Sequence, residues 1–282
     1  MSRGTAGVRD RVTTALLVLA LLVGLGLIAY PSVSDWWNTL HASRVVNQYD
    51  QIVGRTSTQD ANQMLRAAHD YNDELRGRTD KYAWDETEEV RYKTLLNVDG
   101  NGTMGYVQIP RLNLTQPIGH GTRDNVLQQV IGHLEGTSLP VGGIGTHAVL
   151  IGHRGLPSAR LFTDIDRLIA GDLFYVNVLG QTMAYEVDEI HTVLPDDLSH
   201  FEIEPDADLC TLVTCTPYGI NSHRLLVRGR RVDKGQNARV FAEAAFVDQR
   251  LVAIVLAAIM TVVAAVVVLV GTLVWRRVHQ TG

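Results

Sequence analysis

Two long uncharged stretches near the ends of the 282-residue chain restrict its fold more than any other feature. Residues 12–30 and 251–275 contain no charged side chain, and each is long enough to cross a bilayer as a helix. Arginines precede the first stretch and follow the second, which by the positive-inside rule predicts that both termini are cytoplasmic. We therefore expect a two-pass protein of the cell membrane, in contact with membrane lipid, whose middle part lies outside the cell.

Each stretch has an alternative interpretation. The first could be a cleaved signal peptide, but Ala29-Tyr30-Pro31 lacks a small-x-small cleavage site. The second could be a buried core helix, but its uncharged length and the ending Trp275-Arg276-Arg277 are typical of a membrane span.

The stretch of roughly 220 residues between the spans suits one domain with a core plus a helical appendage. The net charge of −5 offers no basic footprint for nucleic acid. The predicted organisation is a cytoplasmic N-terminus (1–11), a transmembrane signal-anchor (12–30), a membrane-proximal helical region (31–95), a main domain (96–235), a membrane-proximal linker (236–250), a C-terminal transmembrane helix (251–275) and a cytoplasmic tail (276–282).

A membrane-proximal amphipathic helix is predicted after the first span, over residues 57–77. Ser57 and Asp60 form a capping box, and the pattern ends at Gly77. The apolar residues with helical spacing are Ala61, Met64, Leu65, Ala68 and Leu75. Residues 78–95 are charged and aromatic without a clear period, so no element is predicted there.

Short strands dominate the rest of the chain. Apolar and β-branched runs predict strands over 104–110, 147–153, 173–178, 183–193, 209–215 and 224–232. Helix-like pieces occur only near 123–130 and 158–170, so the fold class is mainly β, a barrel or a sandwich. No phosphate loop or dinucleotide fingerprint is present, and no cofactor is expected.

The two cysteines, Cys210 and Cys215, lie in one strand-like run. An extended chain separates them by about 16 Å at roughly 3.3 Å per residue, whereas a disulfide needs Cα atoms within about 7 Å. We therefore expect Cys215 to be a free thiol and Cys210 a small buried hydrophobe.

A turn in "TPYGINSH" would make Cys215 and Arg224 neighbours across a hairpin. A nearby cation favours the thiolate, and it can later stabilise an oxyanion. Attack of a thiolate on an amide carbonyl also needs a group that transfers a proton. His153 in "VLIGHRG" suits this role because it is placed at the end of an apolar strand. The competing histidines, for which a structural role is expected, are His120, His133 and His147.

Four segments of the chain resemble sortases, most of all the class C pilin sortases. They read "MGYVQIPRLNLTQPIGHGT", "GHLEGTSLPVGG", "THAVLIGHRGLPSARLFTDID" and "TLVTCTPYGINSHRLLVRGRR", and the resemblance covers about residues 95 to 232. It implies an eight-stranded sortase β-barrel with short helices. It also implies that Cys215 is the nucleophile, His153 the acid/base and Arg224 the cation that orients substrate or stabilises the oxyanion.

The implied reaction is transpeptidation. Secreted pilins or surface proteins with an LPxTG-like sorting signal would be cut between threonine and glycine through a Cys215 thioester. An amine acceptor, in pilin sortases a lysine of the next subunit, would then take the acyl group.

Class C members tend to carry a C-terminal span and a lid with an Asp-Pro-aromatic motif over the cysteine. This chain contains no Asp-Pro pair, and the nearest match is Asp80-Lys81-Tyr82. As a lid, Asp80 would pair with Arg224 and Tyr82 would cover Cys215. Alternatively, 78–95 is a solvated linker, or Trp84-Asp85 forms the lid.

Three kinds of function follow. The first is a pilin polymerase, and the second is a sortase that anchors single surface proteins to a cell-wall precursor amine. The third is a different class, either an inactive membrane scaffold or a zinc protein using His147, His153 and Cys215, whose spacing is not compact like that of structural zinc sites. No metal is expected.

Overall fold

The computed structural model describes residues 4–156 and 160–233, in two units. The first unit includes the described residues up to Tyr30, and the second begins at Pro31. Over these residues, no helix meets both the length and the hydropathy that crossing a bilayer requires. The span predicted over 12–30 is therefore not confirmed, and the one predicted over 251–275 lies outside the described residues.

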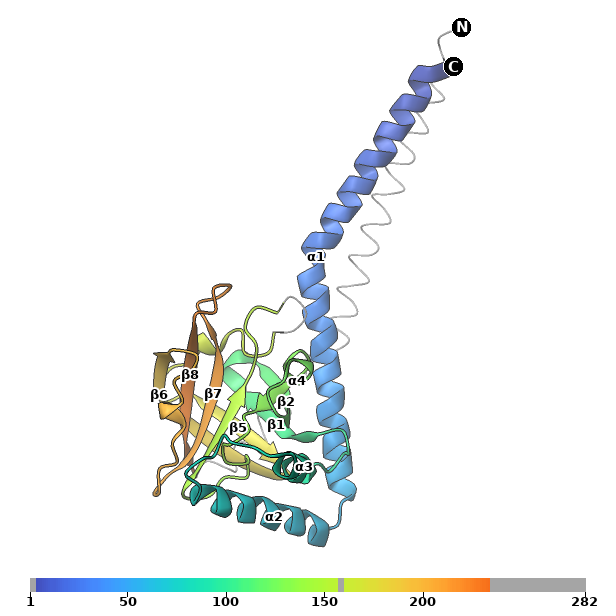
Figure 1. The fold of residues 1–282 in the computed structure, drawn as a ribbon. Coiled ribbons are helices and arrows are strands. Elements are labelled where there is room, and N and C mark those ends of the chain that lie inside the picture. Colours follow the sequence, from blue (N-terminus) through green and yellow to red (C-terminus); the bar gives the residue numbers. More distant parts are fainter. Residues whose placement is uncertain (1–3, 157–159, 234–282) are drawn as a thin grey trace. The chain divides into compact units, whose positions relative to one another are not determined.

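The described elements are mostly short strands (Figure 1). The helices are α1 (Gly4–Arg55), α2 (Thr58–Arg76), α3 (Glu86–Thr94) and α4 (Asp124–Leu127), with 3-10 turns η1 (Pro110–Leu112), η2 (Ile165–Arg167) and η3 (Ser199–Phe201). The strands are β1 (Thr103–Ile109), β2 (Leu114–His120), β3 (Ile131–His133), β4 (Thr146–Ile151), β5 (Leu173–Val178), β6 (Gln181–Val193), β7 (Asp208–Thr216) and β8 (His223–Val232).

The strands close into a barrel in the order β1-β2-β3-β4-β7-β8-β6-β5. Two of its pairings are parallel, β2 with β3 and β4 with β7, and the others are antiparallel. The mainly β fold with eight strands is thus confirmed. Of the two helix-like pieces, 123–130 contains α4, whereas the described part of 158–170 contains only the short turn η2.

Every second side chain along a strand points into the barrel, and these side chains fill its interior. Phe174 and Tyr185 stack with ring centroids 5.5 Å apart, and Gly229 of β8 lies directly against them. A Cβ at Gly229 would approach the Phe174 ring to 2.5 Å, so this strand position requires glycine.

The N-terminal helices pack on the barrel through polar anchors as well as apolar faces. The predicted helix is confirmed as α2, capped by Ser57, whose side chain accepts a hydrogen bond from Asp60 N at 3.1 Å. Asn72 on its buried face donates to Leu139 O at 3.1 Å and accepts from Leu139 N at 2.7 Å. In α1, the Tyr49 hydroxyl donates to Met104 O at 2.9 Å.

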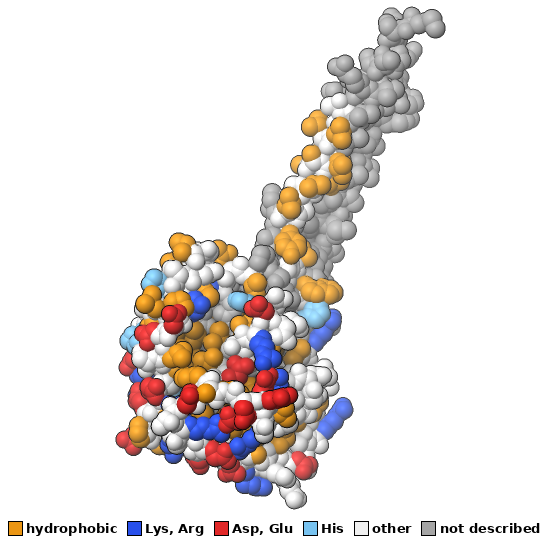
Figure 2. All heavy atoms as spheres, viewed as in Figure 1, with side chains coloured by type: hydrophobic (Ala, Val, Ile, Leu, Met, Phe, Trp, Pro, Cys, Tyr) orange, Lys and Arg blue, Asp and Glu red, His pale blue; other side chains and the backbone are white. Residues whose placement is uncertain are grey.

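Residues 78–95 are not a solvated linker. Asp85 caps α3, and Arg91 of this helix forms a two-bond ion pair with Glu74 of α2. Acidic and basic side chains are interspersed over the α2 and α3 side of the molecule in Figure 2. The sequence pattern missed α3 because Tyr92 is its only buried residue.

Tyr92 connects α3 to a buried histidine of β3. The Tyr92 hydroxyl lies 2.8 Å from His133 Nδ1, and His133 Nε2 lies 2.8 Å from Ser138 O. Since a carbonyl only accepts, Nε2–H donates to Ser138 and Nδ1 accepts from Tyr92. Burial lowers the pKa of His133 to about 4.

Replacing Asn72 with leucine tests the anchor between α2 and the barrel. Asn72→Leu removes both bonds to Leu139 and leaves buried backbone groups unpaired. We expect a loss of about 2 kcal/mol or more in the free energy of unfolding, measured by chemical denaturation. The control Asn62→Leu changes an exposed residue of the same helix. Equal stabilities of the two variants would contradict this account.

His133 makes stability depend on pH in a defined direction. Its folded pKa of about 4 lies below the ordinary value near 6.5, so the unfolded chain binds the proton more readily. Stability should fall as pH drops from about 6.5 toward about 4, by up to about 1.4 kcal/mol per pH unit. His133→Gln should remove this contribution from the pH dependence of denaturation midpoints, whereas His69→Gln, at an exposed site, should retain it.

Candidate active site

The pleat of β7 separates its side chains onto two faces. Cys210 and Leu212 are fully buried in the barrel core, so Thr211, Val213 and Cys215 point to the opposite face. Val213 packs there in a separate apolar cluster, formed by Val149, Val193, Phe201, Val213 and Leu226. Cys215 therefore lies on the outer face of the sheet, at the end of the strand.

The pairing of β7 with β8 places Arg224 opposite Cys215. Their Cα atoms are register partners, two positions beyond the pair of Val213 and Leu226. Directly opposite residues of an antiparallel pair have Cβ atoms about 4.5–5.5 Å apart. The hairpin therefore makes Cys215 and Arg224 neighbours, as the sequence predicts.

The parallel pairing of β4 with β7 leads toward His153. Ile151 is the register partner of Val213, and Gly152 N donates to Val213 O at 3.0 Å. The buried Thr214 hydroxyl donates to Gly152 O at 2.7 Å. His153 follows Gly152, two residues beyond the end of β4. Extending the register of β4 and β7 by these two residues predicts that His153 lies beside Cys215, and we call His153, Cys215 and Arg224 the row.

Arg224 is half-buried and is held by the hairpin turn. Its Nη1 donates to Asn221 O at 3.2 Å and to His223 O at 3.1 Å. Within residues 4–156 and 160–233 it forms no ion pair with a carboxylate. Its positive charge therefore remains available to an oxygen of a bound substrate.

The two cysteines differ as expected. Both are free thiols, Cys210 buried and Cys215 partly exposed. Burial raises the pKa of the Cys210 thiol well above its usual range, which keeps it protonated and unreactive. Cys215 is the accessible thiol.

The competing histidines hold backbone groups. The ring nitrogens of His120 lie 2.9 Å from Gly102 O and 2.7 Å from Leu95 O. His147 is buried, which lowers its pKa, and its ring lies 2.9 Å from Glu202 O and 2.7 Å from the Thr211 hydroxyl. Both nitrogens of His147 are thus occupied, and in the described part of the chain no His, Cys, Asp and Glu side chains form a group that could hold a metal.

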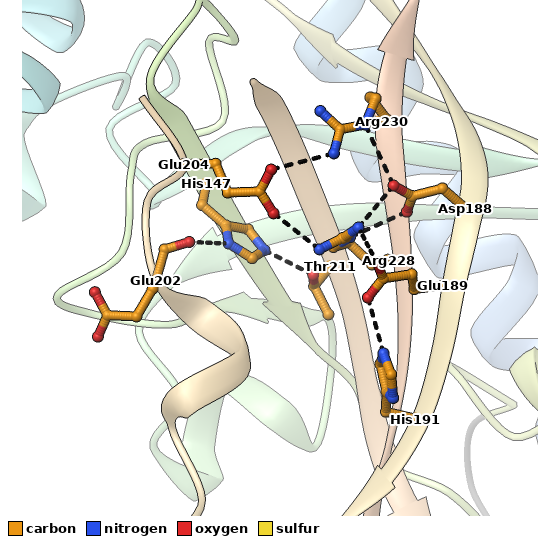
Figure 3. A network of polar contacts seen from close by, with 9 residues as sticks. All are labelled: His147, Asp188, Glu189, His191, Glu202, Glu204, Thr211, Arg228 and Arg230. Atoms are coloured by element: carbon orange, nitrogen blue, oxygen red, sulfur yellow. Dashed lines mark hydrogen bonds and ion pairs between the residues drawn. The ribbon is translucent and has the colours of Figure 1, made fainter. Parts of the chain in front are cut away.

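Figure 3 shows an ionic network that the sequence patterns did not predict, centred on Arg228 and Arg230 of β8. Arg228 of β8 bonds Asp188 at 2.9 Å, Glu189 at 2.5 Å and Glu204 at 3.0 Å, and Arg230 bonds Glu204 at 3.1 Å. Glu204 belongs to the connection between β6 and β7, so the network fixes that connection on the sheet. The facing runs "YEVDEIH" and "VRGRRV" carry the charge pattern that could have predicted it.

The predicted lid residues do not form the expected contact with Arg224. Asp80 is exposed and does not pair with Arg224, whereas Lys81 forms an ion pair with Glu202 at 2.9 Å. Tyr82 lies against Gly136, where an added Cβ would be 2.6 Å from its ring. Trp84 packs edge-on against Tyr92 at 5.0 Å, and Asp85 caps α3.

Comparisons with known proteins agree on one family. The sortase domain family matches residues 107–232. The crystal structure of sortase C1 from Streptococcus agalactiae is 47% identical, covers 68% of this chain and 99% of its own, and has a TM-score of 0.65. Sortase C from Streptococcus pneumoniae is 42% identical, with coverages of 67% and 96% and a TM-score of 0.61.

A curated relative extends the comparison beyond the structures. Sortase D of Bacillus subtilis (strain 168) is 26% identical over 149 residues, which are 52% of this chain and 72% of that protein. Together with the free thiol opposite an arginine at the end of a barrel strand, these similarities identify the chain as a member of the sortase family of cysteine transpeptidases, with class C sortases among its structural neighbours.

Proposed function

We propose that Cys215, His153 and Arg224 carry out the transpeptidation. The observation that carries the proposal is the register that sets Arg224 opposite Cys215, with His153 two residues beyond the end of the neighbouring strand β4. The row supplies a nucleophile, a proton carrier and a cation on one accessible face. We infer no lid role for Asp80 or Tyr82, because Asp80 is exposed without an ion pair to Arg224 and Tyr82 lies against Gly136.

The proposed substrate is a protein with an LPxTG-like sorting signal. The Cys215 thiolate attacks the threonine carbonyl carbon, and negative charge moves onto the carbonyl oxygen. Arg224 stabilises this oxyanion as the C–S bond forms. When the bond to glycine breaks, His153 gives its proton to the departing amine, which leaves a thioester on Cys215.

An amine then resolves the thioester. It attacks the same carbonyl carbon while His153 accepts its proton, an amide bond forms, and Cys215 leaves as a thiolate. We propose a pilin lysine as this amine, so that the product is an isopeptide bond between pilin subunits. Support comes from the S. pneumoniae relative, whose structure is described in terms of pilin substrate specificity. A cell-wall precursor amine is the alternative acceptor, favoured by the missing Asp-Pro pair.

We further propose a membrane location with both termini in the cytoplasm. Its support is the uncharged length of residues 12–30 and 251–275 and the arginines that flank them. This arrangement would hold the barrel at the extracellular surface of the cell membrane, where secreted substrates emerge.

Intact mass spectrometry tests the nucleophile. Full-length protein mixed with an LPxTG-type peptide, without acceptor, should gain the mass of the acyl fragment, and Cys215→Ala should abolish the adduct because no thioester can form. Cys210→Ala is the matched control, because it removes a buried thiol and should leave the adduct intact. An adduct on Cys215→Ala would refute the assignment.

The acceptor is tested by competition on the preformed acyl-enzyme. A pilin lysine peptide and a cell-wall precursor amine at equal concentration should yield mainly the lysine isopeptide, measured by product mass. Preferential transfer to the cell-wall amine would assign an anchoring role instead, while leaving the thioester chemistry unchanged.

A further inference from the structure

Two side-chain contacts join the chain segments that carry His153 and Cys215. On one side, the Thr214 hydroxyl donates to Gly152 O at 2.7 Å. On the other side, Arg154 Nη1 donates to the Thr216 hydroxyl at 3.3 Å. Each contact joins a residue adjacent to His153 with a residue adjacent to Cys215. These side chains hold the two segments together beyond the point where the main-chain hydrogen bonds between β4 and β7 end.

Arg154 is held in this position from a third element. Its Nη2 forms an ion pair with Asp166 of η2 at 2.5 Å, and the arginine side chain is only 12% exposed. The chain folds back over this contact, since Phe162 N donates to His153 O at 3.2 Å and Gly155 N donates to the Thr163 hydroxyl at 3.2 Å. The guanidinium is thus fixed on both sides.

This placement leaves one donor of Arg154 unsatisfied. Its Nε is buried and has no hydrogen-bond partner in the part of the chain that the structure describes. A buried unpaired donor lowers stability, so such a group in a native protein calls for an explanation. Buried polar groups without a partner are expected mainly at functional sites.

We propose that Arg154 is a positioning residue, which fixes the strand end of His153 against that of Cys215 through Thr216 and Asp166. The proposal rests on the proposed roles of His153 and Cys215. Arg154 itself does not touch the reacting atoms, and it acts by setting the distance over which the proton is transferred. Its substitution should therefore affect the chemical step and leave peptide binding unchanged.

The test measures single-turnover acylation of full-length protein by an LPxTG-type peptide over a range of concentrations. Arg154→Met should lower the maximal acylation rate by about 10- to 100-fold, because a misplacement near 1 Å costs on the order of 100-fold. The half-saturating peptide concentration should stay within about twofold of the original. Arg154→Lys, which can retain the ion pair with Asp166, should recover part of the rate.

Arg160→Met is the matched control. Arg160 forms an ion pair with Asp164 at 2.6 Å in the same connection, but it is exposed and, among the described residues, forms no hydrogen bond or ion pair with β7. Its loss removes the same charge and should leave the acylation rate unchanged. If Arg154→Met fails to fold in a thermal melt, Thr216→Val removes the same contact without altering charge and should show the same selective loss of rate.

Three outcomes would overturn the proposal. They are an unchanged acylation rate in a folded Arg154→Met or Thr216→Val variant, a raised half-saturating concentration with an unchanged rate, and an equal rate loss in Arg160→Met. The Cys215→Ala protein is measured in parallel. Acylation that persists in it would refute the proposed function itself, which separates the two failures.

Discussion

The parallel pairing of β4 with β7 is the interaction on which the position of the proposed catalytic groups depends. Because side chains alternate along each strand, this register sends Cys210 and Leu212 into the barrel and Cys215 to the outer face. A shift by one residue would bury the thiol and expose the core. The apolar interior therefore fixes the register that exposes Cys215.

The outer face is organised in successive levels along the strands. The ionic network around Arg228 fixes the connection between β6 and β7, and an apolar cluster that includes Val213 and Phe201 lies in the same region. Cys215 and Arg224 follow as a pair at the strand ends, and His153 lies two residues beyond the end of β4. The proposed chemistry thus lies beside packed structure, which limits the movement of its side chains.

Much of this arrangement follows from local sequence patterns. Apolar and β-branched runs predicted the strands that carry Cys215 and Arg224, and the Ser57 cap predicted the start of α2. Periodicity did not reveal β2, which contains Pro117, or β3, which has three residues. The role of Arg154 could not be predicted, because its contact with Thr216 joins residues 62 positions apart.

The most direct test is a crystal structure of the full-length acyl-enzyme formed with an LPxTG-type peptide. The quantity to measure is the distance from the Arg224 guanidinium to the thioester carbonyl oxygen on Cys215. The account predicts hydrogen-bond contact, about 2.7–3.1 Å, with the His153 ring beside the sulfur. A thioester oxygen bound by other groups, with Arg224 directed away from it, would contradict the assigned row.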